Sequence, residues 1–184
     1  MTRRSTRGIV TCVLAATAAA IPLRAQTSLE YNVKAAFLLN FARFIEWPDT
    51  AFATAQAPIH VCVFGHNPFG DRLARTLQGE NVHNRALTAR QVKSQGESAA
   101  CHLLFVPSGN ESRAAAVIQQ ENSFAVTVGE SPRFEAMGGA VNLVLEEGRV
   151  RFNVNLQPVE SRGIRISARM LQLASRVGRA TPAK

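Results

Sequence analysis

Apolar and polar positions recur along the chain with two periods, one typical of helices and one typical of strands. Over residues 27–46 apolar side chains return every three or four positions, which predicts a helix. Thr27 and Glu30 have the spacing of a capping box, so we expect the helix to begin at Thr27. Trp47-Pro48 should end it, because proline disfavours the α conformation of the residue before it. The remaining polar face is narrow, which indicates a helix buried on two sides, or buried on one and used for contact on the other.

Strand and helix patterns alternate through the middle of the chain. Runs rich in β-branched and other apolar residues predict strands, and continuous apolar runs are typical of strands buried on both faces. Helix starts are indicated by Asn67-Pro68, a good cap followed by a proline, and by a second capping box at Ser108 and Glu111. The predicted strands are 58–64, 85–90, 101–106 and 124–128, and the predicted helices are 68–77 and 108–120.

The last third of the chain changes to alternating patterns. Residues 141–146 and 149–154 alternate, and Glu147-Gly148 between them supplies the glycine that a two-residue turn requires, so we expect a β-hairpin. A short helix is expected over residues 156–162, and a final helix from Ser167 to Gly178. Together these elements predict an α/β fold. Its sheet is mostly parallel and covered by helices on both sides, with a C-terminal antiparallel hairpin at one edge and terminal helices.

The amino terminus has the composition of a secretory signal peptide. Three arginines precede an uncharged, largely apolar run over residues 8–23, which is shorter than a membrane span requires. Ala25 is a small residue suited to cleavage, so we expect residues 1–25 to be a cleaved signal peptide. The alternative is an uncleaved N-terminal anchor. The remainder divides into a single domain over residues 26–178 and a disordered tail over residues 179–184.

Export changes the charge and the cysteine count of the working protein. The full chain has 21 Lys and Arg against 13 Asp and Glu, a net charge of +8, and losing four arginines with the signal lowers this to +4. Since no basic run remains, nucleic-acid binding is not expected. Cys12 also leaves, and the two remaining cysteines, Cys62 and Cys101, suggest one disulfide in an oxidising compartment. The alternative is two buried free thiols.

No residue pattern in the chain predicts catalysis, a cofactor or a metal. Gly65 and Gly70 have the outer spacing of a phosphate loop, but Asp71 follows instead of lysine, so we expect a tight turn. The four histidines lack the spacing of metal ligands, and His60 and His102 are expected to be packed or hydrogen-bonded. No serine has the setting of a nucleophile, and no paired carboxylates suggest acid–base chemistry. We therefore expect a protein that is not an enzyme.

The segment around the single tryptophan is the strongest candidate for contact with a partner or ligand. Trp and Arg are favoured anchors in interfaces, and here both lie near a predicted helix end. The alternative is that Trp47 packs the helix end onto the sheet while Arg43 and Glu46 form a solvated pair. Arg165, just after Gly163, could contact an anion or a partner's carboxylate, with a solvated side chain as its alternative. The candidate contact residues are Asn40, Arg43, Glu46, Trp47 and Arg165.

Three stretches of the chain together resemble the YfiR family. They are residues 31–48, the paired segments 59–64 and 101–106, and residues 141–167, of which the first is the most specific. The resemblance extends over about residues 28–178. It implies a periplasmic α/β protein without known catalysis, in which Cys62 and Cys101 match a cysteine pair of the family. Some members have a further cysteine pair in the C-terminal half, which this chain lacks.

The resemblance also implies a function and partners. The family's type member restrains a diguanylate cyclase anchored in the inner membrane by binding its periplasmic sensor region, and an outer-membrane lipoprotein can draw the repressor away. We therefore expect a periplasmic regulatory binding protein whose partners are a diguanylate cyclase or another membrane sensor, and such a lipoprotein. Any redox control of this binding would depend on a single disulfide between Cys62 and Cys101. The alternative is a periplasmic module that binds a small molecule and reports it to a sensor kinase or transporter. A homodimer is compatible with either hypothesis.

Overall fold

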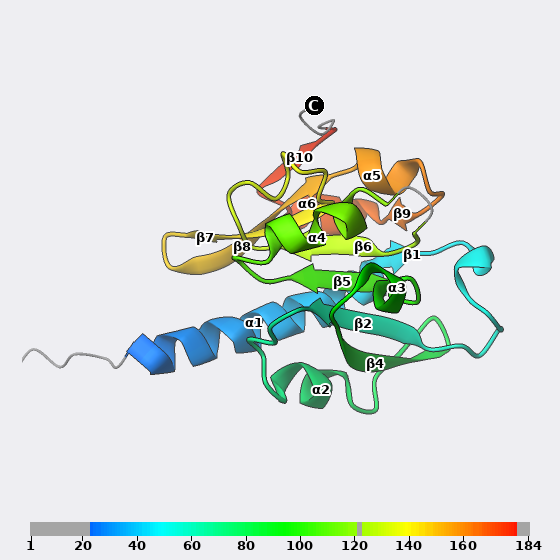
Figure 1. The fold of residues 1–184 in the computed structure, drawn as a ribbon, viewed down its shortest axis with the longest axis horizontal. Helices are drawn as coiled ribbons and strands as arrows, with labels where there is room; N and C mark the ends of the chain where they lie inside the picture. The colour runs from blue at the N-terminus through cyan, green and yellow to red at the C-terminus, as the bar shows by residue number, and fades with distance from the viewer. Residues whose placement is uncertain (1–22, 121–122, 180–184) are drawn as a thin grey trace, which may run out of the picture.

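The computed structural model describes residues 23–120 and 123–179. Within these ranges the chain forms a sheet of eight strands with helices packed on it, and a separate pair of short strands, Ile45–Glu46 with Arg165–Ile166 (Figure 1). The strand order is β10-β8-β7-β6-β5-β2-β4-β3. Strands β7, β6, β5, β2 and β4 run parallel, β10 is parallel to β8, and β8 and β3 are antiparallel to β7 and β4. The strands are β2 (Ile59–Phe64), β3 (Asn81–Val82), β4 (Arg85–Val92), β5 (Leu103–Val106), β6 (Val126–Gly129), β7 (Val141–Glu146), β8 (Arg149–Asn155) and β10 (Arg176–Gly178).

Helices cover both faces of the sheet, because its central strands are buried on both sides. Val61 and Val63 of β2 belong to one core with α1 and α2, whereas Cys62 and Phe64 belong to a second core with α4. This double burial is why the central strands have continuous apolar sequences, and the predicted, mostly parallel α/β fold is confirmed. The helices are α1 (Leu23–Phe44), η1 (Asp49–Ala51), α2 (Arg72–Leu77), α3 (Gln95–Ser98), α4 (Glu111–Ile118), α5 (Gln157–Glu160) and α6 (Ala168–Leu173).

The first helix begins and ends earlier than its sequence pattern predicts. Helix α1 starts at Leu23, so Thr27 lies inside the helix and its predicted role as the N-terminal cap is wrong. The residues before Thr27 include leucine, arginine, alanine and glutamine, which are good helix formers. At the other end the helix stops at Phe44, because the next two residues form strand β1 (Ile45–Glu46). This strand pairs antiparallel with β9 (Arg165–Ile166).

Two other helices begin later than predicted. Asn67 does not cap α2; its side chain accepts a hydrogen bond from the Phe69 N–H (3.0 Å) and donates one to the Gly70 carbonyl (3.1 Å). These bonds stabilise a local turn, and the helix begins only at Arg72. Ser108 likewise lies in a turn before α4, which begins at Glu111. Its backbone N–H donates to Glu130, so the second capping box does not form as predicted.

The predicted hairpin is present, but it does not lie at the sheet edge. Strands β7 and β8 pair with each other, beginning with Glu146 opposite Arg149 on either side of the turn. In the turn itself, Glu147 and Gly148 have φ angles of 49° and 73°. Ser167 caps α6 as predicted, but that helix ends at Leu173 instead of reaching Gly178. The chain then extends into β10, whose pairing covers the outer edge of β8. Residues 176–178 therefore form ladder hydrogen bonds with β8 in place of further helix.

The predicted signal peptide lies largely outside the described residues, and it stays a prediction. Its expected cleavage point, after Ala25, falls within the first turn of α1. Of the predicted tail, only Arg179 is described, and its guanidinium pairs with Glu160. Among the helices of residues 23–120 and 123–179, none combines the length and apolar character needed to cross a membrane.

Candidate functional site

Two of the predicted contact residues, Glu46 and Arg165, face each other across the β1–β9 pair. They are register partners, and Arg165 donates from Nε (3.2 Å) and Nη2 (2.8 Å) to one oxygen of Glu46. Both side chains are largely exposed, so this ion pair contributes little to stability. The structure therefore brings together residues that lie 119 positions apart in the chain, and Arg165 already has a carboxylate partner within the fold.

Trp47 lies beside this pair and packs the end of α1 onto the sheet. Its indole N–H donates to the carbonyl of Phe124 (3.1 Å), and its ring meets the edge of His102 at 5.8 Å between centroids. The indole is half-buried, so part of it is still available for contact. This packing is the alternative that the sequence analysis left open for Trp47.

Asn40 and Arg43 lie on the exposed side of the last part of α1, and Arg43 is in its final turn. Arg43 pairs with Glu80 at 2.7 Å, so the expected solvated pair between Arg43 and Glu46 does not form. Their roles as partner contacts stay predictions, and the structure does not bring them together with Trp47 in one pocket.

A pocket of about 290 Å³ opens beside Trp47, at the amino ends of strands β2 and β4. Two residues of its lining, Phe52 and Arg85, were not predicted as contact residues from the sequence. The Arg85 guanidinium lies 3.6 Å from the centre of the Phe52 ring and donates to the carbonyls of Thr54 (2.9 Å) and Ala57 (2.8 Å). Only the fold brings Phe52 and Arg85 together, so no local pattern signals the contact. The lining residues are Glu46, Trp47, Asp49, Phe52, Ile59, His83, Arg85 and Arg165.

A histidine pair lies beneath this pocket. His102 Nδ1 accepts a hydrogen bond from the His60 backbone N–H (3.2 Å), and its Nε2 lies 3.2 Å from the Ala51 carbonyl. Because Nδ1 accepts, the proton must be on Nε2, which assigns the neutral tautomer of His102. The Phe52 ring stacks on His102 at 4.4 Å, and His60 Nδ1 lies 2.7 Å from the Thr88 hydroxyl. Both histidines are therefore packed and hydrogen-bonded, as predicted.

Burial opposes protonation of both rings. It lowers the pKa of His102 to about 4, although the hydrogen bond to the Ala51 carbonyl acts in the opposite direction. Burial also lowers the pKa of His60, and the positive charge of Arg90 adds to that effect. Both histidines are therefore held in the uncharged form at neutral pH.

The His102 environment predicts a loss of stability in mild acid. The unfolded chain takes up a proton at this position near pH 6.5, whereas the folded chain takes it up only near pH 4. The free energy of unfolding should therefore fall by about 3 kcal/mol between pH 7 and pH 4 on account of His102 alone. Urea denaturation across this range should show a slope that His102→Gln reduces and that replacing the exposed His66 by glutamine leaves unchanged. Equal slopes in the wild type and His102→Gln would contradict the assignment.

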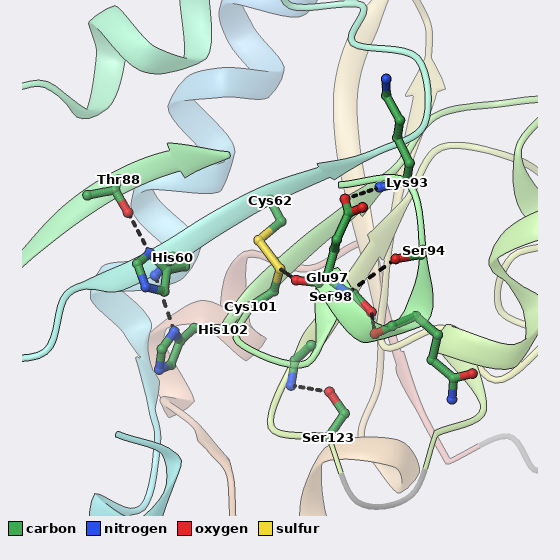
Figure 2. Close-up of a disulfide and its surroundings, with 12 residues drawn as sticks. His60, Cys62, Thr88, Lys93, Ser94, Glu97, Ser98, Cys101, His102 and Ser123 are labelled. Atoms are coloured by element: carbon green, nitrogen blue, oxygen red, sulfur yellow. Dashed lines mark hydrogen bonds between the residues drawn. A yellow bond between two sulfur atoms is a disulfide. The ribbon is translucent and has the colours of Figure 1, made fainter. Parts of the chain in front are cut away.

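A disulfide joins Cys62 of β2 to Cys101 (Figure 2), as predicted. Their Cα atoms are 5.9 Å apart, and both residues are buried in the core beneath α4. Cys101 lies before the first residue of β5, in the connection from α3, so it is not held to the register of that strand. Figure 2 shows the bridge and the histidine pair next to each other, because Cys62 follows His60 by two residues and Cys101 precedes His102.

An internal ion cluster lies at the carboxyl ends of β5 and β6. Ligands of open α/β sheets usually bind outside the carboxyl ends of the strands. Here the Glu130 carboxylate, just after β6, accepts hydrogen bonds from the Tyr31 hydroxyl (3.0 Å), the Lys34 ammonium and the Ser108 N–H (3.0 Å). Burial, reinforced by the Glu130 charge, raises the pKa of Tyr31 above its ordinary value. The cluster ties α1 to the carboxyl ends of β5 and β6.

Within the two described ranges, no group of three or more histidine, cysteine, aspartate or glutamate side chains could hold a metal ion. In the pocket near Trp47, Glu46 and Arg165 pair with each other and Arg85 donates to backbone carbonyls. This arrangement is suited to packing and to recognition by shape and polar contact.

Comparison with protein families identifies a match over most of the chain. The family described as YfiR/HmsC-like matches residues 31–175, which include the disulfide, Trp47 and Arg165. No curated protein matches the chain.

Proposed function

The chain belongs to the YfiR/HmsC-like family, and we propose that it is a periplasmic regulatory binding protein of cyclic-di-GMP signalling. In this proposal it restrains an inner-membrane diguanylate cyclase by binding the cyclase's periplasmic sensor region. The single observation that carries the proposal is the family match, which spans residues 31–175 and thus nearly all of the folded domain. A binding role without catalysis also agrees with a site in which Glu46 pairs with Arg165 and Arg85 donates to backbone carbonyls.

Such a regulator needs a preference for one state of its partner. A soluble protein shifts the cyclase toward the inactive state only by the difference between its affinities for the two states. A hundredfold preference corresponds to about 2.7 kcal/mol, which a few buried side chains at an interface can supply. An outer-membrane lipoprotein that competes for the same face would release the cyclase by lowering the free concentration of the repressor.

The proposal predicts that deleting the gene raises cellular cyclic-di-GMP several-fold, because the cyclase is no longer held inactive. Mass spectrometry of nucleotide extracts measures this directly. Complementation with the full chain should restore the low level, whereas a version that begins at Met followed by residue 26 should not, because it lacks the predicted export signal. Unchanged cyclic-di-GMP in the deletion strain would refute the proposal.

A second candidate function is favoured by the pocket beside Trp47. A volume of about 290 Å³ with two arginines and two aromatic rings suits a small polar ligand, which the protein would report to a sensor kinase or transporter. In that case Arg85→Ala should abolish the response to the ligand while deletion of the gene leaves cyclic-di-GMP unchanged.

A further inference from the structure

The connection from β1 to β2, residues 48–58, lies against the sheet without a buried side chain of its own. Figure 1 shows it in cyan, extending beyond the ends of the strands before it returns as β2. Every residue from 48 to 58 is exposed or only partly buried, and η1 within it buries none of its residues. We call this connection the 48–58 strap. A segment with so little burial opens locally at low free-energy cost unless other contacts hold it.

Two side chains from outside the strap bind it to the sheet. Arg85, the first residue of β4, donates from Nη1 to two strap carbonyls (2.9 and 2.8 Å). His102, just before β5, donates from Nε2 to the Ala51 carbonyl (3.2 Å). The Phe52 ring of the strap lies between the two, with the Arg85 guanidinium 3.6 Å from its centre and the His102 ring stacked at 4.4 Å. The position of the strap therefore depends on the His102 ring.

The His102 ring can make these contacts only in its neutral form. Its Nδ1 accepts the His60 backbone N–H (3.2 Å), a bond that Figure 2 shows. A second proton would be added to Nδ1, so two donors would then face each other and the bond would be lost. Since the imidazole is rigid, turning Nδ1 away from His60 also moves Nε2 away from Ala51 and the ring away from Phe52. Protonation at one edge of the ring thus removes the strap contacts at the other.

The cations around His102 add to this effect. His60 of β2 lies 5.9 Å away between ring centroids, and Arg85 of β4 lies over Phe52. Both lower the pKa of His102, although burial is the largest cause. Arg90 of β4 acts in the same direction on His60, and Arg162 donates to the carbonyls of residues 123 and 125, just before β6. A proton on His102 would therefore add positive charge to a site that already contains Arg85.

The nearby carboxylates do not compensate that charge. Glu46 of β1 and Asp49 of the strap line the pocket beside Trp47. Glu46 is already paired with Arg165, and Asp49 is exposed. Among the described residues, no carboxylate forms an ion pair with His102. Protonation should therefore loosen the strap, because no ion pair to the imidazolium takes the place of the lost contacts.

We propose that protonation of His102 in mild acid releases the 48–58 strap from the sheet while the rest of the domain stays folded. The released strap uncovers the His102 ring and the edge-on contact that Trp47 makes with it, at 5.8 Å between centroids. Acid would thereby alter the surface around Trp47, the strongest candidate for contact with a partner. This inference goes beyond the proposed function and does not depend on it.

Hydrogen exchange of single amides, measured by NMR at pH 7 and pH 5 and corrected for intrinsic rates, tests the proposal. The reporters are the His60 N–H, which His102 accepts, and the Phe52 N–H within the strap. Their protection should fall by about twentyfold, given a pKa of about 4 in the closed form and 6.5 after release. Amides of β5 and β6 should keep their protection. Unchanged reporters, or an equal fall in β5 and β6, would overturn the proposal.

Two histidine variants assign the effect to one ring. His102→Gln keeps an acceptor for the His60 N–H and a donor for the Ala51 carbonyl but does not titrate, so the reporters should have equal protection at pH 7 and pH 5. His60→Gln removes the other ring and should retain the fall. A fall that persists in His102→Gln, or that disappears only in His60→Gln, would contradict the assignment to His102.

A further variant keeps the test decisive should His102→Gln not fold. Arg85→Met removes the guanidinium that holds two strap carbonyls, so the Phe52 amide should lose protection already at pH 7 and lose more at pH 5. The matched control is Arg43→Met, which breaks an exposed pair elsewhere and should behave as the wild type at both pH values. Protection in Arg85→Met equal to that of the wild type at pH 7 would show that the strap is not held in this way, and the proposal would fail.

Discussion

Replacing Lys34 by methionine is expected to lower the free energy of unfolding by about 3–5 kcal/mol, a loss typical of breaking a buried ion pair from one side. The Lys34 and Glu130 side chains are only 8% and 5% exposed, so removing the ammonium leaves the Glu130 carboxylate buried with its charge uncompensated. Glu30 loses the same partner. The Tyr31 and Ser108 hydrogen bonds to Glu130 remain, but they cannot replace a full positive charge.

Urea denaturation at neutral pH measures this loss. A double variant, Lys34→Met with Glu130→Gln, should recover a large part of it, because the buried carboxylate is then replaced by a neutral amide. The matched control is Arg43→Met, which breaks an exposed pair with Glu80 and should cost at most about 1 kcal/mol. If Lys34→Met costs no more than Arg43→Met, the cluster does not hold α1 in the manner described.

Removing the disulfide is expected to have an effect of similar size. The bridge joins residues 39 positions apart, and in the chain-entropy treatment a loop of this length stabilises the fold by about 4 kcal/mol. The loop contains α2, β3, β4 and α3, so the bridge restrains one whole side of the sheet. For a domain of this size the melting temperature of the Cys62→Ala, Cys101→Ala variant should fall on the order of 10 °C.

Thermal unfolding with and without a thiol reductant separates the bridge from the side chains that form it. Reductant should lower the melting temperature of the wild type and leave the double variant unchanged. A wild type that is insensitive to reductant under unfolding conditions would show that the bridge does not form in the protein. A variant that loses stability but still lowers cyclic-di-GMP would establish the bridge as structural and remove redox control from the proposed function.

The sequence allowed most of the strands to be predicted, because their signal is local. Burial on both faces requires continuous apolar runs, so β2 and β5 are recognisable without knowledge of their neighbours. The hairpin turn at Glu147-Gly148 is also a local property of the backbone. Two cysteines, Cys62 and Cys101, follow the predicted signal peptide, so one pairing was possible, and that pairing is the one observed.

The boundaries of helices and the outer strands could not be predicted in the same way. Helix α6 ends at Leu173 because the edge of β8 offers hydrogen bonds to β10, and nothing local to the sequence of α6 signals that edge. Helix α1 ends at Phe44 because Ile45–Glu46 pairs with a segment more than a hundred residues later. In both cases a distant partner decides between two local conformations of similar free energy.

In the candidate site, too, the residue types could be predicted from the sequence but their contacts could not. The sequence by itself determined that Trp47, Glu46 and Arg165 were candidate contact residues, because residue type and helix ends are local information. Only the tertiary structure decided that Glu46 pairs with Arg165 and not with Arg43, and that His102 is buried beneath Phe52. It alone placed Glu130 against Lys34, 96 positions away, and brought Leu29 close to Leu145. The physical reason is that charge pairing, burial and grooves depend on which surfaces meet, and that is set by the packing of the whole chain.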